Sequence, residues 1–314
     1  MAIYPDYLPQ QHSSSRSIVN LALVGLERGR SKGTGLSYAM TGGGEQASSS
    51  GSKLVLLHGI GNSLRYWEEM VVAIPPDRQA LLIDLPGFGG SDWVPSEGFQ
   101  DQSRRISETI RELGFDNDVV VVAHSLGSFF ALEVAIQLGE VVRQVVLIDG
   151  TLARAFDILV SGSAASLNRP ALAAVVFAQF LGGLIPFQGF LAELLSRSSL
   201  LRRVALWPYV SNPAGLDPES LRRVLAGNGG PRATLDVLRE ARFLELELLL
   251  QGVETRVSSV RGENDRLIDD SDVAFYKTHL KEFGGDHKLS ETGHWPMLES
   301  PDLLAECLCR LEAW

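Results

Sequence analysis

Residues 119–127 read VVVVAHSLG, and this stretch decides the interpretation of the whole chain. Its four consecutive valines are typical of a parallel strand covered on both faces, and the run Leu126–Leu138 that follows favours a helix. A serine on such a sharp strand-to-helix turn, here Ser125, projects its hydroxyl above the sheet edge, in the positive field of the helix N-terminus. The turn demands small residues two positions before and after the serine, and Ala123 and Gly127 meet that demand.

The alternation of strand and helix extends on both sides of this stretch. Short, continuously apolar runs recur at residues 54–57, 80–83, 119–122 and 145–148. Helical patterns separate them at residues 63–74, 100–113 and 126–138. Repeated strand, helix and strand units predict a mostly parallel, doubly wound α/β sheet. Upstream, residues 18–26 and 36–41 favour an antiparallel pair, and the glycine- and serine-rich residues 42–52 favour a mobile connection.

The strand rhythm stops after Gly150 and returns about a hundred residues later. Residues 151–249 are helical and apolar in pattern, with proline and glycine breaks. Strands and helices then alternate again at residues 255–260, 271–283, 287–290 and 298–314. The chain is therefore predicted to have a core in two parts, residues 1–150 and 250–314. A helical cap, residues 151–249, is inserted after the sixth strand.

Composition and charge exclude several classes of partner. The chain has 38 acidic and 28 basic residues, a formal net charge of −10, and no basic stripe, which disfavours nucleic acid. Its six histidines are scattered, so no metal site is expected. Cys307 and Cys309 lie two positions apart and point to different helix faces, so neither a disulfide nor a metal pair is expected. No cofactor is indicated, and the pattern says nothing of oligomeric state.

No segment has the pattern of a membrane span or a secretory signal. Residues 1–17 lack an apolar central region. The uncharged stretch 170–192 is interrupted by glycine, proline and glutamine, and favours a buried or cleft-lining helical hairpin. The cytoplasm is therefore the default expectation for location.

Five polar or glycine-rich motifs follow five of the predicted strands. They are HGIG at 58–61, DLPGFG at 84–89, the turn at Ser125, GEND at 262–265 and GHWP at 293–296. Open α/β sheets place their sites at the carboxyl ends of their strands. With these motifs the chain, from about Leu36 onward, resembles the α/β-hydrolase fold superfamily, in its capped, serine-nucleophile branch of esterases, lipases and carbon–carbon hydrolases. One departure is Ala123, where the family's G-x-S-x-G motif has its first glycine.

The resemblance implies a catalytic triad of Ser125, Asp265 and His294, in the chain order typical of this family. A serine hydroxyl is a poor nucleophile, so His294 is expected to take its proton and return it to the leaving group. A carboxylate must orient the imidazole and offset its charge, and Asp265 is the predicted acid. Asp149 is the alternative, because it ends the sixth strand, where some family members keep this acid.

The resemblance also implies an oxyanion hole made by the backbone N–H groups of Ile60 and Leu126. His58 and His124 flank the site in sequence and are expected to serve structure, His58 by tying down the oxyanion loop. Asp84 is expected to shape its own loop.

The apolar cap favours a hydrophobic acyl group or ring over a sugar or a charged metabolite. An ester, lactone or thioester with a hydrophobic acyl part is therefore the predicted substrate. Trp295, Phe180 and Phe187 are candidates for the substrate pocket, although packing within the molecule would account for them equally well.

Three other functions stay open on the sequence. The first is a carbon–carbon hydrolase of the meta-cleavage type, because such enzymes resemble this chain in carrying a tryptophan after the catalytic histidine. Epoxide hydrolases often carry the same tryptophan. An acyl transferase or cyclase of a biosynthetic pathway would use the same triad while excluding water. A binding protein that kept the fold is the least favoured, since the triad and oxyanion loop are intact. Epoxide hydrolases and haloalkane dehalogenases are disfavoured, because they need an aspartate where Ser125 stands.

Overall fold

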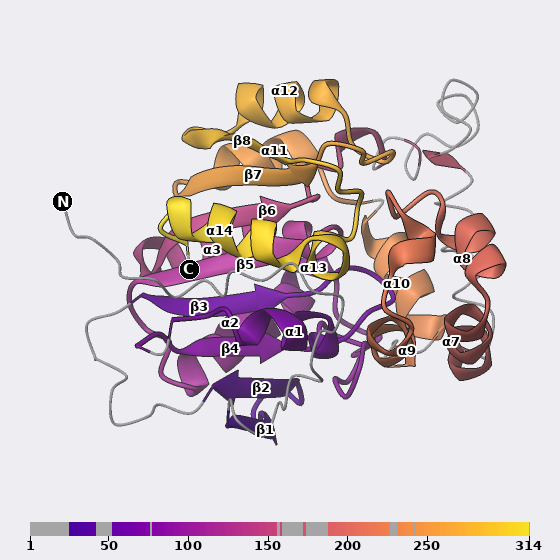
Figure 1. The fold of residues 1–314 in the computed structure, drawn as a ribbon. Helices are drawn as coiled ribbons and strands as arrows, with labels where there is room; N and C mark the ends of the chain where they lie inside the picture. Colours follow the sequence, from indigo (N-terminus) through magenta and orange to yellow (C-terminus); the bar gives the residue numbers. More distant parts are fainter. Residues whose placement is uncertain are drawn as a thin grey trace.

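The computed structural model describes residues 25–41, 52–75, 77–155, 158, 172–173, 188–226, 231–241 and 243–313. Its centre is an eight-stranded sheet with the order β1-β2-β4-β3-β5-β6-β7-β8 (Figure 1). The strands are β1 Leu26–Arg30, β2 Ser37–Thr41, β3 Lys53–Leu57, β4 Ala80–Ile83, β5 Val119–His124, β6 Val142–Ile148, β7 Arg256–Gly262 and β8 Phe283–Leu289.

The sheet is parallel from β4 across to β8 and antiparallel at its other edge. β3 pairs in parallel with β4 and β5, and the pairs β5–β6, β6–β7 and β7–β8 are also parallel. β1 and β2 form an antiparallel pair, and β2 runs antiparallel to β4. Parallel neighbours need crossover connections, and helices supply them here. The predicted mostly parallel, doubly wound sheet is confirmed.

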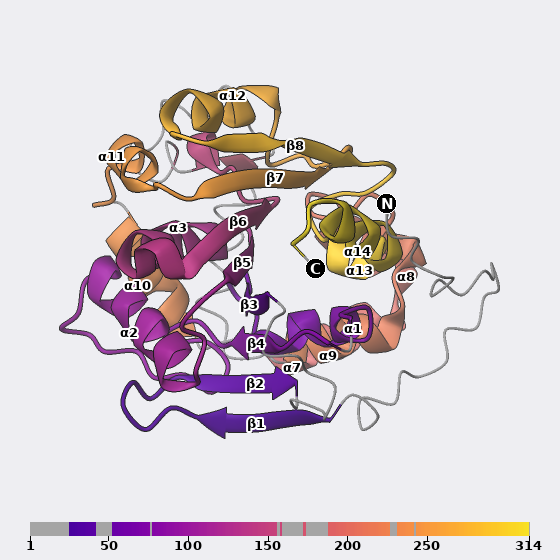
Figure 2. The same ribbon diagram turned by 90° about the vertical axis from the view of Figure 1, so that its left-hand side faces the viewer.

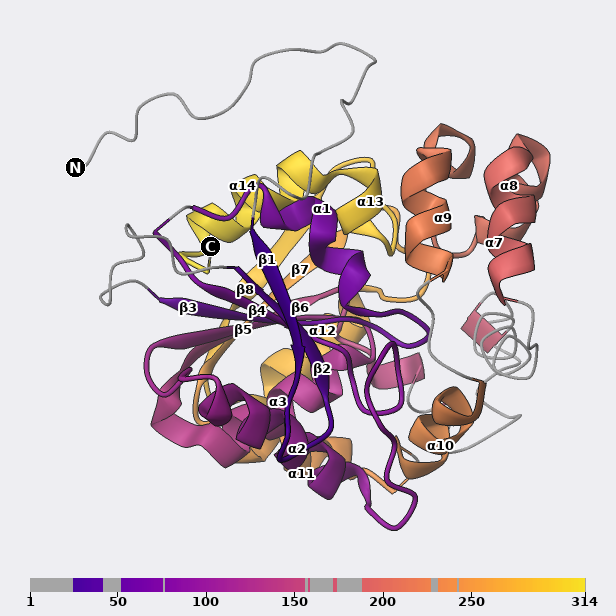
Figure 3. The same ribbon diagram turned by 90° about the horizontal axis from the view of Figure 1, so that it is seen from below.

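Helices cover both faces of the sheet (Figures 2 and 3). On one face lie α2 Phe99–Glu112, α3 Gly127–Leu138 and α11 Leu246–Gly252. On the other lie α1 Glu68–Val71, α13 Pro296–Glu299 and α14 Pro301–Arg310. The helix α12, Asp270–His279, packs against β8 and α11.

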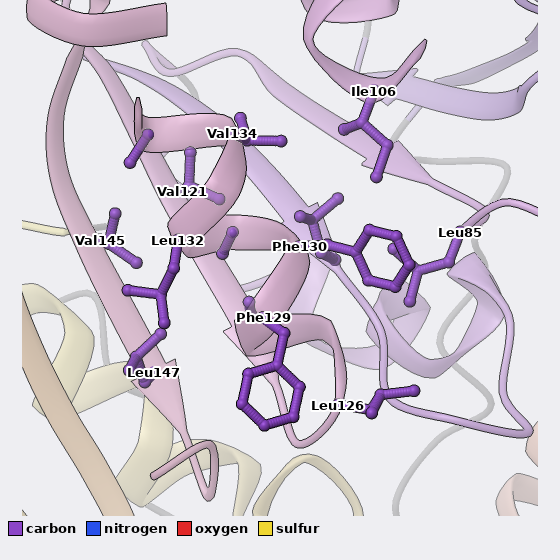
Figure 4. Packing of buried hydrophobic residues seen from close by; sticks show 14 of the residues in the cluster. Leu85, Ile106, Val121, Leu126, Phe129, Phe130, Leu132, Val134, Val145 and Leu147 are labelled. Carbon is purple, nitrogen blue, oxygen red and sulfur yellow. The ribbon is translucent and has the colours of Figure 1, made fainter. Parts of the chain in front are cut away.

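The centre of the core is the pair of β5 and the helix α3 that follows it. Every residue of β5 is buried, and α3 is apolar around almost its whole circumference, as expected of a helix enclosed by other elements. Phe130 of α3 points toward Leu85 and Ile106, while Leu132 lies over Val145 of β6 (Figure 4). Buried over most of their surface, this strand and helix hold the turn between them in a fixed position.

Helices inserted between β6 and β7 form a cap at the carboxyl ends of the parallel strands (Figures 1 and 3). They are α7 Gln188–Arg197, α8 Ser199–Leu206, α9 Pro218–Ala226 and α10 Pro231–Ala241, with a 3-10 turn at Pro213–Gly215. The helix α11 precedes β7 directly and packs on α3 of the core. Among the described residues, no helix combines the length and the apolarity that crossing a membrane requires.

The structure corrects several boundaries. The first strand of the antiparallel pair runs over Leu26–Arg30 and not over residues 18–26, of which 18–24 lie outside the described residues. Residues 63–74 form a short 3-10 helix at Leu64–Trp67 and one turn of α-helix, α1, instead of a continuous helix. Residues 42–51 and most of 170–192 also lie outside the described residues.

The last strand and the terminal helix differ from prediction as well. β8 begins at Phe283, four residues before the predicted start, because its Gly-Gly-Asp segment carries no apolar signal at this sheet edge. The helix before it therefore ends at His279. Pro301 divides the predicted terminal helix into α13 and α14, since a proline interrupts the helical hydrogen-bond ladder. On α14, Cys307 is buried and Cys309 is exposed, which agrees with the predicted different faces.

Gly127, the first residue of α3, offers a test of how tightly the turn is packed. A Cβ there would lie 2.4 Å from the carbonyl oxygen of His58, a backbone atom that cannot rotate away. Gly127→Ala should therefore lower the free energy of unfolding by about 1–3 kcal/mol. Gly33→Ala is the matched control, because its Cβ would meet only a flexible carboxylate oxygen of Glu112, at 3.5 Å. Equal denaturant midpoints for the two variants would contradict the argument.

Candidate active site

Ser125 occupies the turn between β5 and α3 with a left-handed backbone, φ = 50°. Non-glycine residues adopt this conformation rarely, and sharp functional turns are where it is found. The amide of Ser125 donates to the Ile148 carbonyl at 3.0 Å, which ties the turn to the end of β6. The side chain therefore stands at the carboxyl end of the sheet, as the sequence predicts.

His294 lies in the loop between β8 and α13 and is 3% exposed. Its Nε2 atom is 3.0 Å from Ser125 Oγ, and its Nδ1 atom is 2.8 Å from Asp265 Oδ2. Since a carboxylate only accepts, Nδ1 carries a proton and Nε2 is left as the acceptor for the serine hydroxyl. Residues from three strand ends, separated by up to 169 positions, are thus joined in one hydrogen-bonded chain.

Asp265 follows β7, and its side chain is fully buried. Burial alone would raise the pKa of this carboxyl. The adjoining His294 ring opposes this, together with hydrogen bonds from His294, Asp149 and the Leu267 amide, and the net pKa is lowered. The Leu267 amide donates to Oδ1 at 2.7 Å, so both carboxylate oxygens are fixed. Asp265 is therefore held as an anion beside the imidazole.

Asp149, the alternative acid, ends β6 with φ = 43° and is 1% exposed. Its Oδ1 atom accepts a hydrogen bond from the Gly262 amide at 3.0 Å, whereas Asp265 is the carboxylate bonded to His294 Nδ1. Burial raises the pKa of Asp149 well above its usual range, and the charge and hydrogen bond of Asp265 raise it further. Burial and the negative charge of Asp265 thus favour the neutral form of Asp149.

The loop after β3 lies directly against Ser125. A Cβ on Gly59 would lie 3.1 Å from the Ser125 Cβ and 2.8 Å from His124 Nδ1, so a larger residue would displace the loop. In the part of the chain that the structure describes, neither the Ile60 amide nor the Leu126 amide donates to a protein acceptor. The predicted oxyanion hole of these two N–H groups stays a prediction.

His58 and His124 have structural contacts, as the sequence analysis expects. His58 accepts from the Leu85 amide at Nε2 and donates from Nδ1 to the Gly59 carbonyl, joining the ends of β3 and β4. Burial lowers the pKa of His58 and keeps it neutral. His124 donates from Nε2 to the His294 carbonyl at 2.8 Å and so supports the histidine loop. Burial, followed by the neighbouring His294, lowers its pKa well below the usual value.

Three side chains, His124, Asp149 and His294, offer ligand atoms within 4.8 Å of one another. Both ring nitrogens of His294 are already bonded, to Asp265 and Ser125. The Nε2 atom of His124 also serves as a donor to a carbonyl. A metal ion that used His294 as a ligand would have to break the serine–histidine–aspartate chain, so the bonds of His294 fit proton transfer and not metal binding.

Two further residues hold the loop between β8 and α13 that carries His294, and the sequence alone did not indicate them. Glu299 accepts from the Gly293 amide at 3.0 Å and from the Ser211 amide of the cap at 2.7 Å. Tyr209 of the cap accepts from the His294 amide at 2.7 Å. Their partners are distant in sequence or come from backbone atoms, so neither residue type nor spacing could have identified them.

Of the three residues predicted to line the substrate pocket, the structure describes only Trp295. Trp295 is 8% exposed, and its ring stacks on Tyr209 with centroids 5.3 Å apart. It therefore packs the cap onto the histidine loop. Phe180 and Phe187 lie outside the described residues. Asp84 shapes its loop, as expected, because its carboxylate accepts from the amides of Leu64 and Gly90.

A mostly parallel sheet, a strand–serine–helix turn and an acid–histidine pair at neighbouring strand ends define the class of the protein. The model of the alpha/beta hydrolase family matches residues 54–307. The chain therefore belongs to the α/β-hydrolase family, and it is an enzyme of that family.

Individual relatives are more distant or match only locally. The chain is 38% identical over 100 residues to 2-succinyl-6-hydroxy-2,4-cyclohexadiene-1-carboxylate synthase of Yersinia enterocolitica, which is 32% of this chain and 36% of the relative. An esterase of Mycobacterium tuberculosis superposes with a TM-score of 0.64 at 23% identity, over 93% of this chain and 96% of that chain. The epoxide hydrolase CorEH gives 0.66 at 20% identity, over 91% and 97%. At these identities the structural matches establish the fold alone.

Proposed function

We propose that this chain is a serine hydrolase that cleaves an ester, lactone or thioester with a hydrophobic acyl part, through an acyl-enzyme on Ser125. The observation that carries the proposal is the hydrogen-bonded chain from Ser125 Oγ through His294 to Asp265. A neutral imidazole with its lone pair on the serine hydroxyl is poised to take that proton during attack on a carbonyl carbon.

The remaining steps of the proposed reaction use the triad and the predicted oxyanion hole. As the tetrahedral intermediate forms, the N–H groups of Ile60 and Leu126 stabilise its oxyanion. His294, now protonated, gives its proton to the leaving group, while Asp265 offsets the imidazolium charge. A water molecule, activated by the same histidine, then attacks the acyl-enzyme and releases Ser125. The hydrogen bond between His294 Nδ1 and Asp265 supports Asp265 over Asp149 as the triad acid, because Asp149 has no such bond.

An apolar cluster that includes the residue after the nucleophile and extends into the cap supports a hydrophobic acyl group. Leu126 and Leu152 belong to one hydrophobic cluster that reaches Leu172 and Val237 in the segment between β6 and β7. Ile60 packs against the same cluster. Such surroundings favour hydrocarbon over a charged or sugar-like group.

A biosynthetic acyl transferase or cyclase is the second candidate, and the local 38% identity to a synthase favours it. Such an enzyme would use the same nucleophile but keep water from the acyl-enzyme. An epoxide hydrolase is not supported, despite the shared fold, because a serine stands at the nucleophile position.

Ser125→Ala should fold normally and lose nearly all turnover, with a residual rate from binding and the oxyanion hole. A fluorophosphonate probe followed by mass spectrometry should place a single active-site adduct on Ser125 of the wild type and none on the variant. An adduct on another serine would make the assignment wrong. An adduct on Ser125 without turnover of any ester in water would favour the transferase or cyclase.

Asp265→Asn should lower kcat by roughly three to four orders of magnitude, since the amide favours the wrong imidazole tautomer. Asp149→Asn is the matched control and should cost far less, because Asp149 is not bonded to the imidazole. Steady-state kinetics on the purified, folded variants decides between them. The reverse ranking would assign the acid role to the end of β6.

Activity on p-nitrophenyl esters should rise from acetate to a medium acyl chain and then fall. Each buried methylene contributes about 0.8 kcal/mol, and enzyme pockets discriminate one methylene by roughly 1–3 kcal/mol. The measurement is kcat/KM over a chain-length series. Phe180→Ala or Phe187→Ala should shift the optimum toward bulkier acyl groups. A flat profile that favours acetate would contradict the hydrophobic pocket while leaving the triad untouched.

A further inference from the structure

A short segment of the cap is bonded to both loops that carry the acid and the base of the triad. It consists of residues 207–211, which follow α8, and we call it the bridge segment. On the side of the histidine loop, the His294 amide donates to the Tyr209 carbonyl at 2.7 Å. The Glu299 carboxylate accepts from the Ser211 amide and from an amide of the histidine loop. The bridge segment and the histidine loop are therefore joined through their backbones.

Gly293 shows how closely these two backbones approach each other. A Cβ at this position would lie 2.7 Å from the Ser211 amide nitrogen and 2.9 Å from the Tyr209 carbonyl oxygen. Backbone atoms cannot rotate away from such a contact, so only glycine fits here. A shift of the bridge segment would therefore carry the histidine loop with it.

The loop after β7, which carries Asp265 and is here called the acid loop, binds the same segment. Arg266 Nη1 donates to the Trp207 carbonyl at 2.6 Å and to the Val210 carbonyl at 3.2 Å. The guanidinium also lies over the Trp207 ring, 5.0 Å from its centroid. A single side chain of the acid loop thus contacts both ends of a four-residue stretch of the cap.

An arginine suits this place because α8 ends just before Trp207. The last carbonyls of a helix lack helical partners and favour a nearby cation. On the other side of Asp265 in the sequence, Asn264 donates from Nδ2 to Ser211 Oγ at 3.0 Å. The residues before and after the triad acid are therefore both bonded to the bridge segment.

We propose that Arg266 is a positioning residue, which holds the bridge segment against the acid loop so that the segment fixes the spacing of Asp265 and His294. Besides the triad bond, the two loops meet where the Asn264 amide donates to the Thr292 carbonyl at 2.8 Å. The bridge segment adds a second connection, from Arg266 to the His294 amide. The inference rests on the proposed function, since a residue can position the triad for catalysis only if the triad is catalytic.

Arg266→Met and Arg266→Lys separate the hydrogen bonds of Arg266 from its packing. Both variants keep an unbranched chain that can cover Trp207, but only lysine has donors. Arg266→Met should lower kcat for p-nitrophenyl butyrate by about 10- to 100-fold, because the spacing of Asp265 and His294 relaxes. KM should change by less than about twofold, because substrate contacts are kept. Arg266→Lys should stay within about fivefold of the wild-type kcat, because its ammonium can donate to the same carbonyls.

Arg222→Ala is the matched control for these variants. Arg222 is an arginine of the cap helix α9, 49% exposed, that pairs with Glu219 on the same helix. Its removal leaves the bridge segment bonded to both loops, so kcat and KM should equal those of the wild type.

A double-mutant cycle tests whether Arg266 and Glu299 hold the same segment. Glu299→Gln weakens the connection to the histidine loop, because an amide has one acceptor oxygen where a carboxylate has two. Breaking either end of a connection in series already frees the segment. The loss of kcat in the double variant Arg266→Met with Glu299→Gln should therefore be at least about fivefold smaller than the product of the two single losses. Arg222→Ala combined with Glu299→Gln should show no such coupling.

The proton between His294 Nδ1 and Asp265 gives a readout without substrate. Such a proton has a separate, far-downfield 1H NMR signal while its exchange with water is slow. In Arg266→Met the two loops should separate more often, so this signal should broaden through exchange. It should stay sharp in the wild type, in Arg266→Lys and in Arg222→Ala.

Each outcome has a definite meaning. Losses of kcat that multiply in the cycle with Glu299→Gln, or equal losses in Arg266→Lys and Arg266→Met, would overturn the inference. A raised KM with unchanged kcat in Arg266→Met would overturn it too and make Arg266 a residue of substrate binding. If the fluorophosphonate fails to label Ser125 in the wild type, the proposed function is wrong. The NMR signal then still decides whether Arg266 holds Asp265 and His294 together.

Discussion

The left-handed backbone at Ser125 is the constraint on which the rest of the site depends. A residue with φ = 50° between a buried strand and a buried helix cannot relax, because both neighbours are held by the core. The close approach of α3 to β3 leaves no room for a Cβ at Gly127, so the helix must begin with glycine. The strain is therefore held by packing on both sides, and the serine hydroxyl stays above the sheet.

The histidine loop depends on the cap as much as on the core. The His294 amide donates a hydrogen bond to the Tyr209 carbonyl. The Glu299 carboxylate accepts from the Gly293 amide of this loop and from the Ser211 amide of the cap. The Trp295 ring adds a stacked contact to Tyr209. His294 is thus positioned by a cap segment more than eighty residues earlier in the chain, and any displacement of residues 209–211 would move the imidazole. These contacts join the cap to the loop that carries His294.

The sequence predicted the sheet and the strand-end motifs because both depend on local patterns. Continuous apolar runs marked β3 to β6, and each polar motif stands where its strand ends. The edge strand β8 was placed too late, since Gly284 and Gly285 carry no apolar pattern, and the register with β7 shifts at this point, where Gly285 pairs with Ser258. The long helix expected at residues 63–74 is a 3-10 turn and one α-helical turn. The contacts that hold the His294 loop could not be predicted either, because they come from the backbone carbonyl of Tyr209 and from the Glu299 carboxylate, which also binds the cap.

Asp149 and Asp265 show why two acids at neighbouring strand ends need not be alternatives. The interior around them can hold one negative charge near the imidazole, and hydrogen bonds decide which carboxyl carries it. In the proposed reaction, a single anion on Asp265 compensates the single cation that forms when His294 takes the serine proton. A second anion at Asp149 would leave one buried charge unpaired, at a cost that low polarity makes large. The strand-end position that made Asp149 a candidate for the triad acid is also the position at which burial beside Asp265 raises its pKa. Its Oδ1 atom accepts from the Gly262 amide and not from the imidazole.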